Sequence, residues 1–304
     1  MFAAPPTVDA QVFARLPDTY RKPEATSEWH RYQPGRQPAH SLLEGPSFDH
    51  NGNLYCVDVP WGRVFRVSPQ GEFTLVAEYD GEPNGLKLHR DGRIFIADYS
   101  RGILVLDPES GQVEPLIERV QLERLKAVND LVFASNGDLY FTDQGLTGLH
   151  DSSGRVFRRT ADGRIDCLLD RVPSPNGLVL DASETTLYVA VTRANAIWRV
   201  PLTADGRVTK VGTFIQMSGG GGPDGLAIDE EGNLAVAHVG LGAVWLFSHR
   251  GEPMLRINAP TGALTTNIAY GGPDRKTLYI TESESGSILT AEMPVPGRKM
   301  FSGV

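Results

Sequence analysis

Six polar residues recur along the chain, each at the start of a similar segment. Consecutive members are 40 to 48 residues apart, and every side chain carries an oxygen atom that can bind a cation. Two are carboxylates and four are carboxamides, so together they offer the hard oxygen ligands that divalent cations such as Ca²⁺ prefer. The six residues are Glu44, Asn84, Asn129, Asn176, Asp224 and Asn267.

Each of these residues opens a repeated phrase of two apolar strands joined by a turn. The first copy is EGPSFDHNGNLYCVD, from Glu44 to Asp58, and the third is NDLVFASNGDLYFTD, from Asn129 to Asp143. Asn-Gly and Asp-Gly pairs in the turns accept the positive φ of tight hairpins, and the second strands are largely β-branched and aromatic. A third strand follows each copy and a fourth follows several. This period is typical of the blades of a β-propeller.

We therefore predict an all-β fold, a six-bladed β-propeller with four-stranded blades, as a single domain over residues 1–304. The blades begin near residues 44, 84, 129, 176, 224 and 267. The sixth repeat ends after its third strand, and residues 1–43 precede the first repeat. We expect this N-terminal segment to close the ring with a strand from between residues 10 and 43, because closure removes an exposed strand edge.

The strand directions predict where the six polar residues lie. The first strand of each blade lines the central channel, so residues that open this strand converge at one mouth of the channel. A simpler explanation, that Asn and Asp before Gly are ordinary turn residues, accounts for one or two positions better than for six. With two carboxylates to balance its charge, the predicted ion is one divalent metal, preferably Ca²⁺, with Mg²⁺, Mn²⁺ or Zn²⁺ as alternatives.

The second strands end on the same face as the first strands begin. We expect the aspartates among these ends to hold loops. His238 breaks the acidic pattern and is a candidate base or substrate contact, with a structural histidine as the alternative. The six ends are Asp58, Asp98, Asp143, Val191, His238 and Glu282.

Composition excludes several classes of partner. The formal net charge of −8 argues against binding to nucleic acid or to an anionic membrane surface. The chain has no run of 18 apolar residues and no basic stretch followed by an apolar core, so we expect a cytoplasmic protein.

Two cysteines make no disulfide framework, and the absence of a Gly-x-Ser-x-Gly motif argues against a serine hydrolase. The sequence makes no prediction about oligomeric state.

The repeated motifs resemble the gluconolactonase, regucalcin and senescence-marker-protein family. The matching elements are EGP at Glu44, PNGL at Asn176 and PDGLAID at Asp224, with VND at Asn129 and the late TTNIAYGG, over residues 43 to about 290. The resemblance implies a propeller with one catalytic metal held by Glu44, Asn176 and Asp224. It also implies that Asn129 completes the metal shell or touches the substrate.

The same resemblance implies a lactone hydrolase whose substrate is a small-molecule lactone, with Asp224 as the acid/base. Diisopropyl fluorophosphatase is similar in site design, which leaves phosphotriester hydrolysis as an alternative; a non-catalytic ligand-binding propeller is another. Sugar-lactone members carry an Arg close before the third-blade Asn, whereas this chain has Arg124 and Lys126 at different places in RLKAVND.

Further residues are expected to contact the substrate at this mouth of the channel. Loop residues such as Trp61, Tyr99, Leu146 and Leu241 would make the pocket more apolar than a sugar needs. The predicted substrate contacts are Asn84, Tyr99, Trp61, Asn129, His238 and Asn267.

Overall fold

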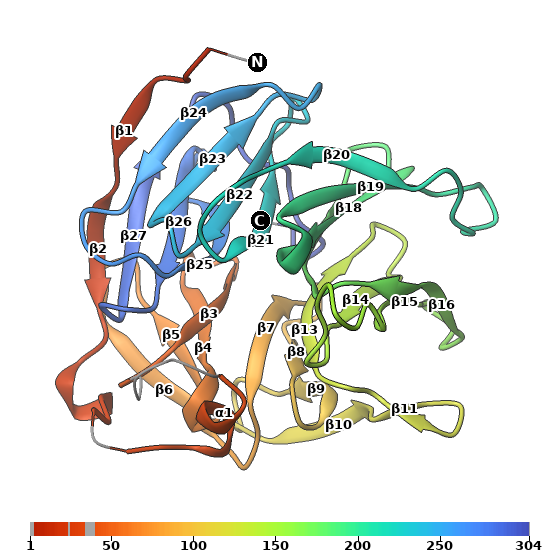
Figure 1. Cartoon of the computed structure of the whole chain (residues 1–304). Coiled ribbons are helices and arrows are strands. Elements are labelled where there is room, and N and C mark those ends of the chain that lie inside the picture. The colour runs from red at the N-terminus through yellow and green to blue at the C-terminus, as the bar shows by residue number, and fades with distance from the viewer. Residues whose placement is uncertain (1–2, 24, 34–39, 304) are drawn as a thin grey trace.

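A computed structural model describes residues 3–23, 25–33 and 40–303, and within these ranges six four-stranded antiparallel units surround a central axis (Figure 1). The strands of each blade follow one another from the axis outward in chain order, except in the last blade. The predicted all-β, six-bladed propeller is confirmed.

The first three blades each use four consecutive strands. Blade one contains β3 (Leu43–Phe48), β4 (Leu54–Asp58), β5 (Arg63–Val67) and β6 (Phe73–Glu78). Blade two contains β7 (Pro83–Leu88), β8 (Ile94–Asp98), β9 (Gly102–Leu106) and β10 (Val113–Ile117). Blade three contains β13 (Val128–Phe133), β14 (Leu139–Asp143), β15 (Gly154–Arg159) and β16 (Ile165–Val172). A short hairpin of β11 (Arg119–Val120) and β12 (Glu123–Arg124) links blades two and three.

The last three blades repeat this plan. Blade four contains β17 (Pro175–Leu180), β18 (Thr186–Val191), β19 (Ala196–Pro201) and β20 (Gly212–Gln216). Blade five contains β21 (Gly222–Ile228), β22 (Leu234–Val239), β23 (Ala243–Phe247) and β24 (Pro253–Asn258). Blade six contains β25 (Thr265–Gly271), β26 (Thr277–Glu282) and β27 (Ser287–Glu292), followed at its outer edge by β2 (Gln11–Arg15).

The N-terminal segment closes the ring as predicted. Strand β2 pairs antiparallel with β27, and it lies within the interval expected from the sequence. Strand β1 (Thr7–Asp9) adds a feature that the sequence did not predict, since it pairs in parallel with β24 and extends blade five to five strands. The two N-terminal strands thus join blades five and six along their outer edges (Figure 1). Residues 34–39 of the segment lie outside the described residues.

The hydrophobic core is divided among the interfaces between neighbouring blades. Six clusters of buried apolar side chains each combine residues of two adjacent blades. The cluster between blades one and two, for example, packs Val57 and Val64 against Leu86 and Ile96. Burial between blades holds the ring together without filling its axis, so polar side chains can occupy the axis without displacing the core.

Short helical turns cover parts of the ring. In the described ranges these are η1 (Asp18–Tyr20), α1 (Glu28–Arg31), η2 (Val59–Trp61) and η3 (Thr192–Ala194). Helix α1 buries Trp29 over blade one and sits near the channel mouth (Figure 1). Among the described residues, no helix has both the length and the apolar character that a membrane crossing requires.

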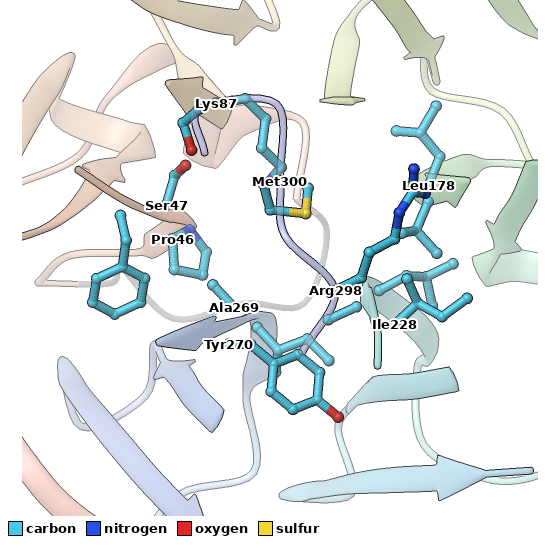
Figure 2. Close-up of a pocket in the computed structure, with 15 residues that line it drawn as sticks. Pro46, Ser47, Lys87, Leu178, Ile228, Ala269, Tyr270, Arg298 and Met300 are labelled. Atoms are coloured by element: carbon cyan, nitrogen blue, oxygen red, sulfur yellow. The ribbon is translucent and has the colours of Figure 1, made fainter. Parts of the chain in front are cut away.

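The C-terminal residues close the opposite end of the channel. Arg298 donates to the carbonyl oxygens of Leu180 and Asp181 and to Glu184, while Phe301 stacks on Phe133. One cavity of about 40 Å³ lies there, and Met300 is between Lys87 and Arg298 in it (Figure 2). The C-terminal segment therefore packs across this end of the channel.

Ring closure by the N-terminal segment can be tested at Leu16, which directly follows β2 and is 2% exposed. Replacing Leu16 by Ala should lower the free energy of unfolding by about 2–5 kcal/mol, because it leaves a cavity in the core between blades six and one. Urea denaturation measures this change. The control is Val12→Ala on β2, where the side chain is 39% exposed and a much smaller loss is expected. Equal losses in the two variants would contradict the burial of this segment.

Candidate metal centre

The first strands bring five of the six predicted polar residues to one pocket. This pocket has a volume of about 390 Å³, within the range of small-molecule sites. The side chains lie at its inner end and are buried, with exposures of 2% to 7%. The five residues are Glu44, Asn84, Asn129, Asn176 and Asp224.

The sixth position of this set is Thr266, one residue before the predicted Asn267. Leu226 in blade five and Ile268 in blade six are the first residues to pair with the second strand after the bulge. Thr266 lies two residues before Ile268, as Asp224 lies two residues before Leu226, so Thr266 is the equivalent of Asp224. Thr266 lines the pocket, whereas Asn267 points below it. The hairpin of β25 and β26 extends further beyond its bulge than that of β21 and β22, since Ile268 and Ile280 are 12 residues apart and Leu226 and Val236 are 10 apart, and this hid the shift in the sequence. We call Glu44, Asn84, Asn129, Asn176, Asp224 and Thr266 the axial ring.

A β-bulge aims each ring side chain at the axis. In all six blades, the pairing between the first and second strands shifts register at the ring residue or just after it. A bulge bends its strand and redirects a side chain, and bulges are common beside active sites. Hydroxyl groups from the second strand support two of these bulges, since Thr142 accepts from the Asp130 N–H and Thr281 accepts from the Asn267 N–H.

Carboxylates at the ends of the second strands hold the chain just before the ring residues. Asp58 accepts from the Leu42 N–H at 2.8 Å, and Asp98 accepts from the Glu82 N–H at 2.9 Å. Asp143 and Glu282 make the same kind of bond in blades three and six, to the backbone N–H groups of Ala127 and Leu264. In each case the donor lies two residues before a ring residue. The aspartates therefore hold loops, as the sequence predicted.

Asn129 is oriented by a network from blades two and three. Its Nδ2 donates to the Tyr99 hydroxyl at 3.0 Å and to Gln144 Oε1 at 3.1 Å, and the Tyr99 hydroxyl donates to the same Gln144 oxygen. Gln144 in turn donates to Ser174. With both amide hydrogens engaged, Asn129 Oδ1 is buried and has no hydrogen-bond partner among the described residues. A buried amide oxygen that accepts no hydrogen bond is suited to bind a cation.

Glu44 is held through one of its two carboxylate oxygens. Oε2 accepts from the Gly45 N–H and from Asn267 Nδ2, both at 2.8 Å. Burial raises the pKa of Glu44 well above its usual range, and the nearby carboxylates of Asp224 and Asp130 raise it further. The pocket thus concentrates negative charge that a bound cation would neutralise.

The chemistry of the ring fits a divalent ion with oxygen ligands. Among the described residues, no group of three or more His, Cys, Asp or Glu side chains is arranged to hold a metal. An ion at this place therefore requires carboxamide oxygens beside the carboxylates. Glu44, Asn129, Asn176 and Asp224 supply such a mixed set, which suits Ca²⁺ better than Zn²⁺.

Three residues predicted to contact the substrate lie outside the pocket lining. His238 is 1% exposed, and its Nε2 is 3.0 Å from the Gly219 carbonyl oxygen, beneath the glycine-rich segment before Asp224. Burial lowers the pKa of His238, which favours the neutral ring. The Trp61 indole donates to the His40 carbonyl oxygen. Asn267 is displaced by the register of blade six, as described above.

The rest of the pocket lining is mixed in character. Its apolar and aromatic side chains include Trp29, Tyr32, Leu42, Tyr99 and Leu146, and Leu146 is 63% exposed. Its polar side chains come mainly from loops of blades three and four and include Gln144, Thr147, His150, Ser174 and Arg193. Sequence analysis missed Gln144, Ser174 and Thr266, although Gln144 directly follows the Asp143 that ends its strand.

Comparison with known proteins shows a family relationship over most of the chain. Residues 42–284 match the family model described as SMP-30/Gluconolactonase/LRE-like region. The lactonase drp35 of Staphylococcus aureus strain MRSA252 is 32% identical over 72% of this chain and 70% of its own length. A gluconolactonase of Zymomonas mobilis is 31% identical over 80% of this chain and 76% of its own length.

Solved structures with lower sequence identity share the fold. A regucalcin of Agrobacterium tumefaciens strain C58, described as a calcium-binding protein, has a TM-score of 0.77 at 23% identity and covers 100% of both chains. A gluconolactonase of Xanthomonas campestris has a TM-score of 0.74 at 23% identity, covering 94% of this chain and 95% of its own.

The carboxylates behind the ring make a testable contribution to stability. Asp143 accepts from two backbone N–H groups and also from Nε and Nη2 of Arg155, whose side chain is only 10% exposed. Replacing Asp143 by Asn should cost about 3–5 kcal/mol of unfolding free energy, because it leaves a largely buried guanidinium with the exposed Glu123 as its remaining carboxylate partner. Urea denaturation measures the cost. Asp205→Asn, in an exposed turn, is the control and should leave the transition unchanged; an equal effect would refute the special role of Asp143.

Proposed function

Because the chain belongs to the SMP-30/Gluconolactonase/LRE-like family, we propose that it is a metal-dependent hydrolase that opens a small lactone in the pocket over the axial ring. The matched relatives named lactonase and gluconolactonase support the reaction. The single observation that supports this pocket as the place is the convergence of two buried carboxylates with the unpartnered Asn129 oxygen. A scaffold that only bound other molecules would have no need to bury carboxylates that repel each other.

The proposed ion is Ca²⁺, held by Glu44, Asn129, Asn176 and Asp224. When bound, it would polarise the lactone carbonyl and stabilise the negative charge that develops on the carbonyl oxygen. The description of the Agrobacterium tumefaciens regucalcin as calcium-binding supports this choice over Mg²⁺, Mn²⁺ or Zn²⁺.

Asp224 is the proposed acid/base. Its carboxylate accepts a proton from a water molecule as the water oxygen bonds to the carbonyl carbon of the lactone. The ring C–O bond then breaks, and Asp224 returns the proton to the departing ring oxygen. The product is the open hydroxy acid, and Asp224 ends in its starting state. General acid/base catalysis of this kind contributes about 10²–10⁴-fold to the rate.

The substrate would lie above the ring, in contact with the apolar side chains of the lining. We propose Asn84, Tyr99 and Asn129 as its polar contacts, because all three line the pocket beside the ring. Leu42 and Leu146 offer apolar surface to the rest of the molecule. These apolar side chains suit a lactone with apolar substituents better than one that is hydroxylated at every carbon.

Metal-dependent lactone hydrolysis can be tested with a panel of γ- and δ-lactones, including a sugar lactone. Acid release in a pH-indicator assay should be lost after treatment with EDTA and restored by Ca²⁺, because the ion would supply the main stabilisation of the developing charge. A phosphotriester belongs in the same panel to detect the alternative activity. Hydrolysis that EDTA leaves unchanged would remove the metal from the mechanism.

The role of Asp224 predicts a selective loss in Asp224→Asn. Turnover should fall by about 10²-fold or more even when added Ca²⁺ restores metal binding, because the amide cannot accept the proton from water. Steady-state kinetics at saturating Ca²⁺ measure the loss, and circular dichroism checks that the fold is kept. Turnover close to that of the unmodified protein would contradict the assignment.

A further inference from the structure

A second layer of residues lies directly below the axial ring. It is formed by the residue that follows each ring position, and in four of the six blades this residue is glycine. Blades three and six instead carry polar side chains that face each other across the channel. The six positions are Gly45, Gly85, Asp130, Gly177, Gly225 and Asn267.

The glycines leave the space that these two side chains fill. A Cβ atom on Gly225 would lie 2.1 Å from Asn267 Oδ1, and one on Gly85 would lie 2.6 Å from Asp130 Oδ1. Real Cβ atoms do not approach other atoms this closely, so a larger residue at either glycine would displace the polar side chain. The two polar residues and the glycines around them therefore form one closely packed layer across the channel.

Hydrogen bonds connect this layer to Glu44. Asn267 Nδ2 donates to Glu44 Oε2 at 2.8 Å and is 3.4 Å from Asp130 Oδ2. Asn267 Oδ1 accepts from the Ile268 N–H at 2.8 Å, so the amide group has one orientation that satisfies both of its ends. Asn267, Asp130 and Glu44 are all at most 3% exposed, which leaves no room for water to replace these bonds freely.

We propose that Asn267 is a positioning residue for the metal ligand Glu44, with Asp130 fixing the orientation of the Asn267 amide. By engaging Oε2 from below, Asn267 leaves the other carboxylate oxygen of Glu44 to face the ion. This inference rests on the proposed metal-dependent function, and it replaces a substrate contact with a structural task for Asn267. Residues that hold a metal ligand typically change metal affinity by 10–100-fold when they are replaced.

The test is calorimetric titration of the metal-free protein with Ca²⁺, in the absence of any lactone. Asn267→Leu keeps the approximate size of the side chain and removes its hydrogen bonds, and Asn267→Ala provides a second variant if leucine prevents folding. We expect the dissociation constant for Ca²⁺ to rise 10–100-fold in either variant. Asp130→Asn should produce a smaller rise, because it weakens only the support of the amide.

Kinetics separate positioning from substrate contact. At Ca²⁺ concentrations that saturate the variant, Asn267→Leu should recover most of its kcat on a hydrolysed lactone, with KM unchanged. A raised KM with unchanged Ca²⁺ affinity would overturn the inference and show a substrate contact. The same inference fails if Ca²⁺ affinity is unchanged and only the melting temperature falls, since that result shows a purely structural role.

A matched control is Asn233→Ala. Asn233 is also buried, at 3% exposure, and its Nδ2 donates to Asp229 at 2.9 Å in a turn away from the ring. It should lower stability without changing Ca²⁺ affinity. The unmodified protein reports separately on the proposed function: binding of Ca²⁺ without hydrolysis of any lactone would refute the activity and leave the positioning role standing, whereas no binding of Ca²⁺ would refute both.

Discussion

The central constraint on this molecule is the burial of like charges around one axis. Glu44 and Asp224 meet at the inner end of the pocket, and Asp130 lies one layer below them. Desolvation and mutual repulsion disfavour the charged state of Glu44, as its raised pKa shows. The surrounding structure opposes this cost with N–H donors aimed at the carboxylate, and a bound cation would oppose it further. Most of the local geometry near the axis can be understood as a response to this constraint.

The propeller makes such an axis physically possible. Its apolar side chains are buried between blades, where six clusters hold neighbouring sheets together. The innermost strands can then present polar groups to one another without losing core packing. Bulges in these strands turn the ring side chains inward, and carboxylates at the second-strand ends fix the chain two residues earlier. Rigid sheets thus support a site assembled from single residues of separate blades.

Two amide networks give the ring its chemical asymmetry. Tyr99 and Gln144 occupy the amide hydrogens of Asn129 and leave its oxygen bare, whereas Asn267 donates to Glu44 from below. One asparagine is thereby prepared as an acceptor, and the other serves as a donor. The pocket lining above the ring adds both apolar and polar side chains. A lactone combines a carbonyl group with a carbon skeleton, and a pocket of this kind can orient both.

The sequence by itself determined the number of blades, the boundaries of their first two strands and five of the six ring positions, because hairpin turns and strand patterns are local. The resemblance to the gluconolactonase and regucalcin family also followed from short motifs, whose residues are close together in the chain. Only the tertiary structure decided that Thr266, rather than Asn267, completes the ring, because a longer hairpin changes the register of blade six. It alone decided the parallel pairing of β1 with β24 and the bond from Asn267 to Glu44, which joins residues 223 positions apart. Such contacts depend on how the blades close into a ring, and no local pattern of residues encodes them.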